Sequence, residues 1–258
     1  MSNLTFLSDN RVLEASLSMI TGTANAQFPL TNIQHDFTTK VFRSNEDTIE
    51  ILVDLKQSVA IDSFAIVGSS VSGLGFGDIS LYGSLSTNFT GATDIPVDVS
   101  AEHNFGFKLW DSAGSFRYWK LVINNTGGDY VELSNLYLGV RTEIANGIDL
   151  NTFKYVQQDN TKITTNAYGQ RFIDSYNKSK TMSGQIKFLN KQEFDTINNL
   201  YIQHGKSIPI WVIVDPDGVM ASDGEYLFSG YFYFSKDLSY VSSGPFLYNV
   251  ELILGEAT

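Results

Sequence analysis

The stretch Ile49-Glu-Ile-Leu-Val-Asp-Leu55, followed by Ile61-Asp-Ser-Phe-Ala-Ile-Val67, decides the fold class of this chain. Apolar and polar residues alternate through much of the first segment, and the second ends in an apolar run that Gly68 closes. Both segments have the length of a strand and are rich in β-branched residues, which suit a pleated, half-buried surface. The stretch therefore predicts two strands of a β-protein.

Three further strand-like segments follow in the first half, separated by turn residues such as Asn124-Asn-Thr-Gly-Gly128. They are Asp78-Ile-Ser-Leu-Tyr-Gly83, Tyr118-Trp-Lys-Leu-Val-Ile123 and Tyr130-Val-Glu-Leu-Ser-Asn-Leu-Tyr-Leu138. Short strands at this spacing, with no helical period between them, favour a sandwich or barrel. Residues 141–152 have no strong period of either kind. We therefore predict a β-sandwich domain over residues 1–145 and a second domain over residues 146–258.

The second half combines strand-like segments with one amphipathic helix near residues 190–204. Asn190 can cap this helix, Glu193 completes a capping box, and Gly205 is a plausible stop. The helix places Phe194, Ile197, Leu200 and Tyr201 on one face. Strands are predicted around it at Arg171–Tyr176, Thr181–Leu189, Ile208–Val214, Tyr226–Phe234 and Phe246–Leu254. The whole chain is thus predicted to be mainly β, with an α+β second domain.

Composition excludes several classes of function. The chain has 258 residues, no cysteine and a formal net charge of −11, so disulfides and thiolate sites are excluded and binding to phosphate backbones is disfavoured. The first residues do not read as a signal peptide, and no apolar stretch reaches the roughly 18 residues of a membrane span. We therefore expect a protein that folds in a reducing cytoplasm, without nucleic-acid binding or membrane insertion.

No catalytic or metal-binding pattern stands out. The three histidines, His35, His103 and His204, lack partners at metal-ligand spacing, so we expect no metal and no cofactor. The acidic pairs Asp215/Asp217 and Asp223/Glu225 could in principle serve a glycosidase. They lie among Pro and Gly in a predicted hairpin loop, which favours solvated turn residues. The sequence therefore predicts a protein that is not an enzyme.

The first half resembles the discoidin-like, or galactose-binding-like, jelly roll over roughly residues 10 to 140. The matching segments, in order, are Asn25–Asp36, Phe42-Arg-Ser44, Ile49–Leu55, Phe116-Arg-Tyr-Trp-Lys-Leu-Val-Ile123 and Val131–Gly139. Lys56 stands where that family's pattern has a glycine, and the family's paired cysteines are absent. The resemblance implies a β-sandwich jelly roll.

In that family glycans usually bind to loops at one end of the barrel. The resemblance therefore makes His35, Asp36, Trp110 and Asp111 candidates for carbohydrate binding. A tryptophan exposed beside polar groups can stack on the apolar face of a sugar ring. The alternative is that Trp110 is a buried anchor, which the general tendency of aromatic residues towards burial favours.

The second half is similar to phage tail proteins of the distal-tail or baseplate type over about residues 150 to 258. The likeness lies in the order of a polar segment, Arg171-Phe, the strand Ser183–Leu189, the helix from Asn190, the phrase Tyr201–Val212, a Gly-containing hairpin and a terminal strand with Glu251. It implies assembly into a homo-oligomeric ring with other phage tail or baseplate proteins. The helix face with Phe194, Ile197 and Tyr201 is the predicted assembly interface.

Three hypotheses follow. The first is a structural virion protein of a phage tail tip or baseplate, made in the cytoplasm of the host bacterium, whose second domain assembles and whose jelly roll is presented. The second is a carbohydrate-binding module or host-surface adhesin. The least favoured is a glycosidase, which has no positive support in the sequence.

Overall fold

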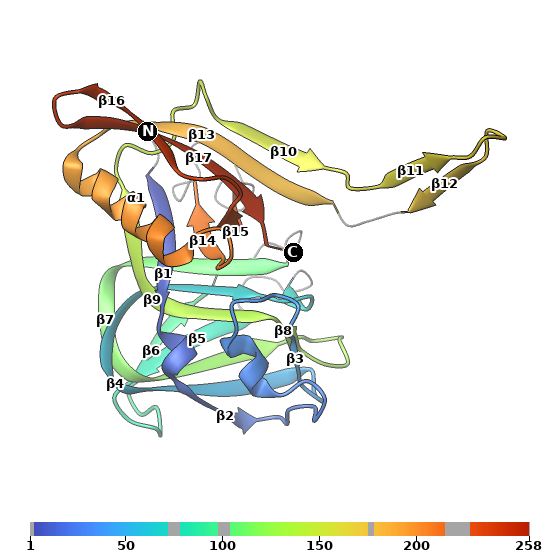
Figure 1. Cartoon of the computed structure of the whole chain (residues 1–258). Coiled ribbons are helices and arrows are strands. Elements are labelled where there is room, and N and C mark those ends of the chain that lie inside the picture. Colours follow the sequence, from blue (N-terminus) through green and yellow to red (C-terminus); the bar gives the residue numbers. More distant parts are fainter. Residues whose placement is uncertain (1–2, 72–77, 98–103, 175–177, 215–227, 258) are drawn as a thin grey trace. The chain divides into compact units, whose positions relative to one another are not determined.

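The computed structural model describes residues 3–71, 78–97, 104–174, 178–214 and 228–257, and its described part is mainly β (Figure 1). The chain divides into two compact units. The jelly-roll unit is Phe6–Thr142, and the α+β unit is Glu143–Thr258 together with Met1–Thr5. The division falls between Thr142 and Glu143, within three residues of the predicted boundary, but the first residues of the chain belong to the second unit.

The jelly-roll unit is an antiparallel β-sandwich with two short 3₁₀ helices. The strand order is β1-β9-β4-β7-β5-β6, β2 pairs with β4, and β3 pairs with β8. The elements are β1 Leu4–Asn10, η1 Arg11–Glu14, β2 Ser16–Thr21, η2 Leu30–Gln34, β3 Phe42–Arg43, β4 Thr48–Val67, β5 Ile79–Ser84, β6 Thr93–Pro96, β7 Phe105–Asn124, β8 Glu132–Leu133 and β9 Asn135–Ile144.

Two bent strands, β4 and β7, build both layers of this sandwich. The first part of β4 pairs with β2 and with the end of β7, whereas its last part pairs with β9 and with the start of β7. Register shifts between Asp54 and Val59 and between Ile61 and Ser63 separate the two parts. Such irregularities bend a strand. The two predicted strands at 49–55 and 61–67 are therefore one bent strand.

One apolar core fills the jelly roll. Along β4, Ile49, Ile51 and Val53 are buried while Glu50 and Asp54 between and after them are not, as the two-residue period of a strand requires. The opposing strands contribute Trp119, Leu121, Ile123, Leu136 and Leu138 to the same cluster. The alternation read from the sequence is thus the core pattern of the structure.

The α+β unit has a sheet of order β10-β13-β17-β15-β14, with β16 paired to β17 and a separate two-stranded sheet β11-β12. Its only helix in the described residues is α1. The elements are β10 Lys154–Gln158, β11 Lys162–Thr165, β12 Arg171–Asp174, β13 Ser179–Leu189, α1 Lys191–His204, β14 Ile210–Ile213, β15 Ser229–Phe234, β16 Ser239–Gly244 and β17 Leu247–Glu256.

The helix begins and ends where the sequence predicts. The Asn190 side chain accepts from the Glu193 backbone N–H (2.9 Å), and the Glu193 carboxylate accepts from the Asn190 N–H (3.0 Å). This is the predicted capping box. Gly205, with φ +54°, donates to the Tyr201 carbonyl and closes the last turn. The polar strands β10, β11 and β16 were not predicted.

Candidate functional site

One end of the jelly roll holds a cluster of polar and aromatic side chains around Arg43. Its guanidinium lies 4.7 Å from the centre of the Phe28 ring and 4.4 Å from that of Tyr130. Arg43 Nε donates to Glu132 Oε2 (2.9 Å), and Ser69 Oγ donates to Glu132 Oε1 (2.6 Å). Arg43 and Glu132 face each other across the β3–β8 pair. The cluster therefore joins four segments of the chain at one end of the sandwich.

The charges of this cluster are held fixed. Burial raises the pKa of Glu132, but the hydrogen bonds from Ser69 and Arg43 outweigh it, so the pKa lies below its ordinary value. The hydrogen bond to Glu132 raises the pKa of Arg43 in turn. A carboxylate that stays ionised and keeps both oxygens bonded is a poor general acid or base near neutral pH. The arrangement suits rigid presentation of the rings and not proton transfer.

His35 and Asp36 lie at this same end of the jelly roll. The His35 carbonyl accepts from Asn135 Nδ2 (3.0 Å), and Asn135 pairs with Val67 at the end of β4, next to Ser69. The His35 ring lies 3.2 Å from Lys40 Nζ, and Phe37 in the same loop is 58% exposed. An exposed ring beside hydrogen-bonding groups is therefore present here.

Trp110 and Asp111 lie away from His35 and Asp36. Trp110 Nε1 donates to the Ile61 carbonyl (2.9 Å), six residues from Val67 along β4, which corresponds to roughly 20 Å. The Trp110 ring packs against the core, with its centre 6.1 Å from that of Trp119. Asp111 is fully exposed, 3.7 Å from Arg141. The structure favours the anchor interpretation of Trp110 and divides the four predicted residues between two places.

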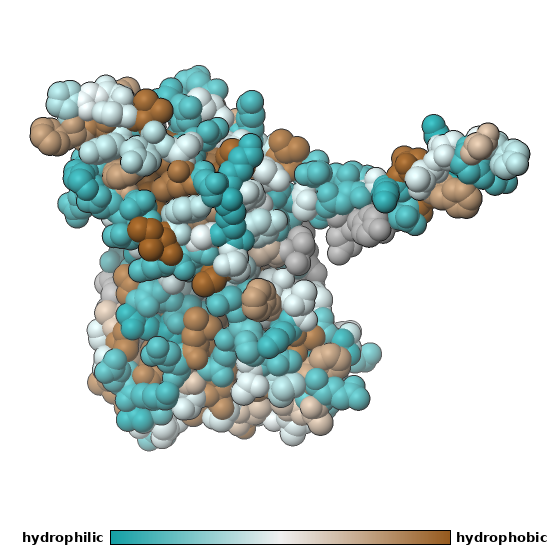
Figure 2. All heavy atoms as spheres, in the orientation of Figure 1, coloured by the Kyte–Doolittle hydropathy of each residue, from teal (hydrophilic) through white to brown (hydrophobic). Residues whose placement is uncertain are grey.

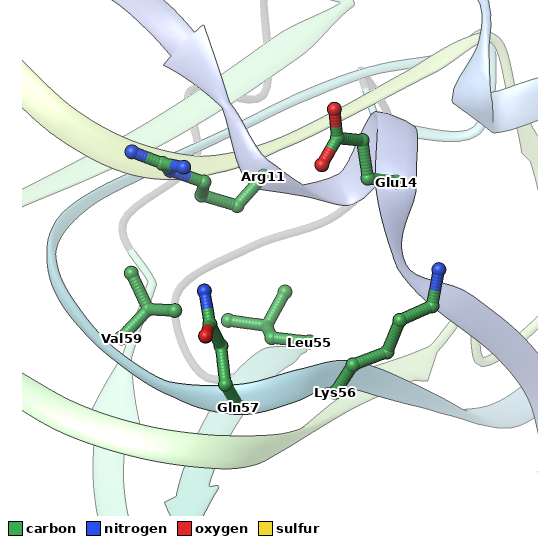
Figure 3. A pocket seen from close by; sticks show the side chains of 6 residues that line it. All are labelled: Arg11, Glu14, Leu55, Lys56, Gln57 and Val59. Atoms are coloured by element: carbon green, nitrogen blue, oxygen red, sulfur yellow. The ribbon is translucent and has the colours of Figure 1, made fainter.

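A shallow cleft of about 240 Å³ lies at the bend of β4 (Figure 3). Lys56 on its rim has φ +64°, a left-handed conformation that favours glycine, and its N–H donates to Asp54 Oδ1 (2.7 Å). This is the position where the discoidin-like pattern has glycine. The volume of the cleft is below the roughly 300 Å³ at which sites for drug-sized ligands begin. The cleft is lined by Arg11, Glu14, Leu55, Lys56, Gln57 and Val59.

The predicted assembly interface on α1 is covered by its own unit. Ile197 is completely buried and Phe194 nearly so, with its ring stacked 4.4 Å from that of Tyr248. The Tyr201 ring meets Phe234 edge-on, and its hydroxyl donates to Asp237 (3.0 Å). These side chains hold the helix on the sheet. The prediction that Phe194 and Ile197 face another subunit is therefore corrected, whereas the half-buried Tyr201 stays a prediction. An amphipathic helix and an interface have the same sequence pattern.

A different apolar surface in this unit is open. The arm, defined as residues 154–180 without the undescribed 175–177, comprises β10, β11, β12 and the start of β13. Every residue of β11 and β12 is exposed, and Figure 2 shows apolar side chains among the polar ones there. Each of the following is more than half exposed: Val156, Ile163, Tyr168, Phe172 and Ile173. A sequence signal existed, since apolar residues recur in this polar segment.

A search for metal-binding groups covers only the described residues. In that part of the chain no group of three or more His, Asp or Glu side chains could hold a metal ion. His103 and the acidic pairs Asp215/Asp217 and Asp223/Glu225 lie outside the described residues. No helix in the described ranges is long and apolar enough to cross a membrane.

Comparisons with known proteins find similarity only among solved structures. No protein-family model and no curated protein matches the chain. Among solved structures, it is similar to a CBM32 module of a family 31 glycoside hydrolase from Clostridium perfringens, with 13% identity and a TM-score of 0.41 over 52% of this chain and 99% of that one. The chitosan-binding module 1 of a chitosanase/glucanase from Paenibacillus sp. IK-5 has 16% identity and a TM-score of 0.41, over 51% and 99%.

A third similar structure is the family 32 carbohydrate-binding module of Clostridium perfringens NanJ in complex with galactose. It has 14% identity and a TM-score of 0.40, over 54% of this chain and 99% of that module. These likenesses cover about half of the chain, and at such values they say nothing of its function. The jelly roll is assigned from the strand pairing described above.

Proposed function

We propose that this protein is a non-enzymatic structural component of a bacteriophage tail tip or baseplate. The α+β unit joins the assembly, and the jelly-roll unit presents a surface. The single observation that supports assembly is the arm, whose apolar side chains are exposed and are not covered by the described residues of their own unit. The assignment to a phage tail rests in addition on the resemblance of the second half to distal-tail proteins.

The low intrinsic stability of the arm and its exposed apolar side chains favour a binding partner. A two-stranded ladder such as β11-β12 is marginally stable alone in water, because neither face is packed. Ile163 and Ile173 are directly paired and lie on one face, while Phe172 lies on the other. Exposed apolar side chains concentrated on one element mark interaction sites. Docking on a neighbour would cover them.

Labelling of phage particles tests this function. An antibody against the purified chain is expected to label one end of the tail in particles from cells that carry the gene. The arm variant I163S/F172S/I173S, supplied in place of the normal chain, is expected to fold and to be missing from the tails. Tails that bind no antibody, or that incorporate the arm variant normally, would contradict the proposal.

A second function, carbohydrate binding by the jelly roll, is favoured by the end that carries Arg43. There Phe37 and Tyr130 expose aromatic rings, and His35 and Lys40 supply hydrogen-bonding groups. Apolar ring faces combined with polar groups are what a saccharide requires. The two functions are compatible, because a tail component that presents a glycan-binding unit would contact the host surface.

Titration calorimetry with host envelope polysaccharide tests the second function. Phe37→Ala is expected to weaken binding about tenfold or more, since a stacking ring contributes about 1–3 kcal/mol by burial. Tyr168→Ala is the matched control, because it removes an exposed ring from the arm, and it should leave binding unchanged. Absence of binding at millimolar saccharide, or equal loss in both variants, would count against this function.

A further inference from the structure

An apolar groove of about 430 Å³ lies in the α+β unit, away from the arm. Its walls carry Leu150 and Phe188, both 61% exposed. An ion pair between Lys187 Nζ and Asp149 (2.5 Å) borders it. The groove is lined by Asn146, Gly147, Asp149, Leu150, Asn151, Lys187 and Phe188.

Phe188 is turned outward by a strained backbone. The register of β13 with β17 shifts between Ile186 and Leu189, and Phe188 within this bulge has φ +58°. Its N–H donates to Asn249 Oδ1 (3.0 Å), and its carbonyl accepts from Asn146 Nδ2 (3.2 Å). A bulge re-aims a side chain, and a left-handed aromatic residue costs free energy that hydrogen bonds here offset. The fold therefore holds a large apolar side chain in solvent at this point.

The arm and the rest of its unit have opposite charges. Residues 154–180 contain five basic and two acidic residues, a net charge of +3. The remainder of Glu143–Thr258 contains four basic and eleven acidic residues, a net charge of −7. An arm that is both basic and apolar is complementary to another copy of its own acidic unit. The charge distribution therefore favours a second copy as the partner.

The arm and the groove are at opposite ends of β13. Ser179 at the arm end pairs with Gln158, and Phe188 at the groove end is nine residues further, roughly 30 Å away. Figure 1 shows β11 and β12 beyond the start of β13, away from its end near α1. A surface at one end that fits a different surface at the other end gives a head-to-tail contact.

We propose that the arm of one copy docks its apolar side chains in the Leu150–Phe188 groove of a second copy. This inference rests on the proposed assembly function and names its partner and its site. Repetition of a head-to-tail contact produces a closed ring where the rotation closes and an open filament where it does not. The contact is both apolar and electrostatic, so added salt weakens it.

Sedimentation velocity of the full chain over a range of concentrations tests the groove. Phe188→Asn removes the apolar wall, and asparagine tolerates φ above zero better than phenylalanine does. Self-association is expected to weaken at least tenfold, while the thermal midpoint stays the same or rises. The matched control is Phe246→Asn, at an exposed position with φ +63° in the β16–β17 turn, and it should leave association unchanged. Equal effects of the two variants would overturn the proposal.

A mixing experiment tests the head-to-tail geometry. The arm variant I163S/F172S/I173S and Phe188→Asn should each remain monomeric alone. Mixed in equal amounts, they should form a pair and nothing larger, because one supplies an intact groove and the other an intact arm. Self-association of Phe188→Asn at the level of the normal chain would mean that arms bind elsewhere, which overturns the groove assignment.

The two proposals fail in different ways. If the arm variant is lost from tails while Phe188→Asn is incorporated normally, the groove is wrong and the assembly function stands. If the arm variant is incorporated normally, the assembly function itself fails. Association of the normal chain that resists salt would contradict the charge argument for a second copy.

Discussion

The α+β unit contains two apolar surfaces that look alike in the sequence and differ in the structure. The face of α1 with Phe194 and Ile197 is packed on its own sheet, and the arm with Phe172 and Ile173 is exposed to solvent. Both consist of aromatic and branched residues among polar ones. The difference is that α1 packs on a sheet of its own unit, whereas no described element of that unit covers the arm. Apolar residues thus indicate burial, and only topology tells whether the chain or a partner supplies it.

The largest expected effect lies on the helix side of this comparison. Ile197→Ala should lower the free energy of unfolding by about 2–5 kcal/mol, because it leaves a cavity in a completely buried position. Ile173→Ala on the arm should change it by less than about 0.5 kcal/mol. Urea unfolding of the full chain, followed by tryptophan fluorescence, measures both. Similar losses would mean that the arm is packed in solution, which would break the comparison.

The N-terminal cap of α1 should contribute less to the free energy of unfolding than the buried Ile197 side chain does. Asn190→Ala removes one half of the capping box and should lower the stability of the α+β unit by about 1 kcal/mol. Asn190→Ser keeps a capping oxygen and serves as the control. Hydrogen exchange of the first-turn amides of α1 reports the effect locally. Equal protection in the alanine and serine variants would show that packing alone holds the helix.

For the arm, we expect an effect on its accessibility to protease and not on the stability of the chain. Trypsin should cut the monomeric chain first at Lys162 or Arg171, since every residue of β11 and β12 is exposed. Association at high protein concentration should slow this cleavage several-fold. The Phe188→Asn chain, which leaves the arm itself intact, should remain sensitive at every concentration. Protection that is independent of concentration would place the cover of the arm within one chain.

Much of the fold could be predicted because its signals are local. The alternation of apolar and polar residues along Ile49–Leu55 predicts which face of the strand is buried. Asn190 and Glu193 predict where the helix begins. The union of two predicted strands into β4 could not be predicted, because the bend depends on a bulge between Asp54 and Val59. Strands β10, β11 and β16 were missed because strands without a buried face lack the apolar period.

The candidate sites were predicted less well, since a site depends on residues distant in sequence. His35 lies in a loop at the same end as the Arg43 cluster, but the sequence does not identify Arg43 and Tyr130, which organise that cluster, as site residues. Trp110 was joined to His35 by a family resemblance, whereas β4 places the two at different ends. The interface on α1 followed from amphipathicity, which does not state what the apolar face will meet.

The smallest expected effect concerns the charged network at the end of α1. Asp237 accepts from Lys206 (2.7 Å) and from the Tyr201 hydroxyl, and these hydrogen bonds, Lys206 first, lower the pKa of Asp237. A carboxyl whose pKa is lower in the folded state contributes stability above its unfolded pKa of about 3.9, and loses it as the pH falls through the folded value. Asp237→Asn should therefore be slightly less stable than the normal chain at pH 7, and equally stable at about pH 3 or below. Asparagine still accepts from Tyr201, so the difference isolates the charge, and Lys206→Met in the Asp237→Asn background should add nothing to it. A difference that persists in acid would show that Asp237 acts through shape, and the last turn of α1 would then be held by packing like the rest of its face.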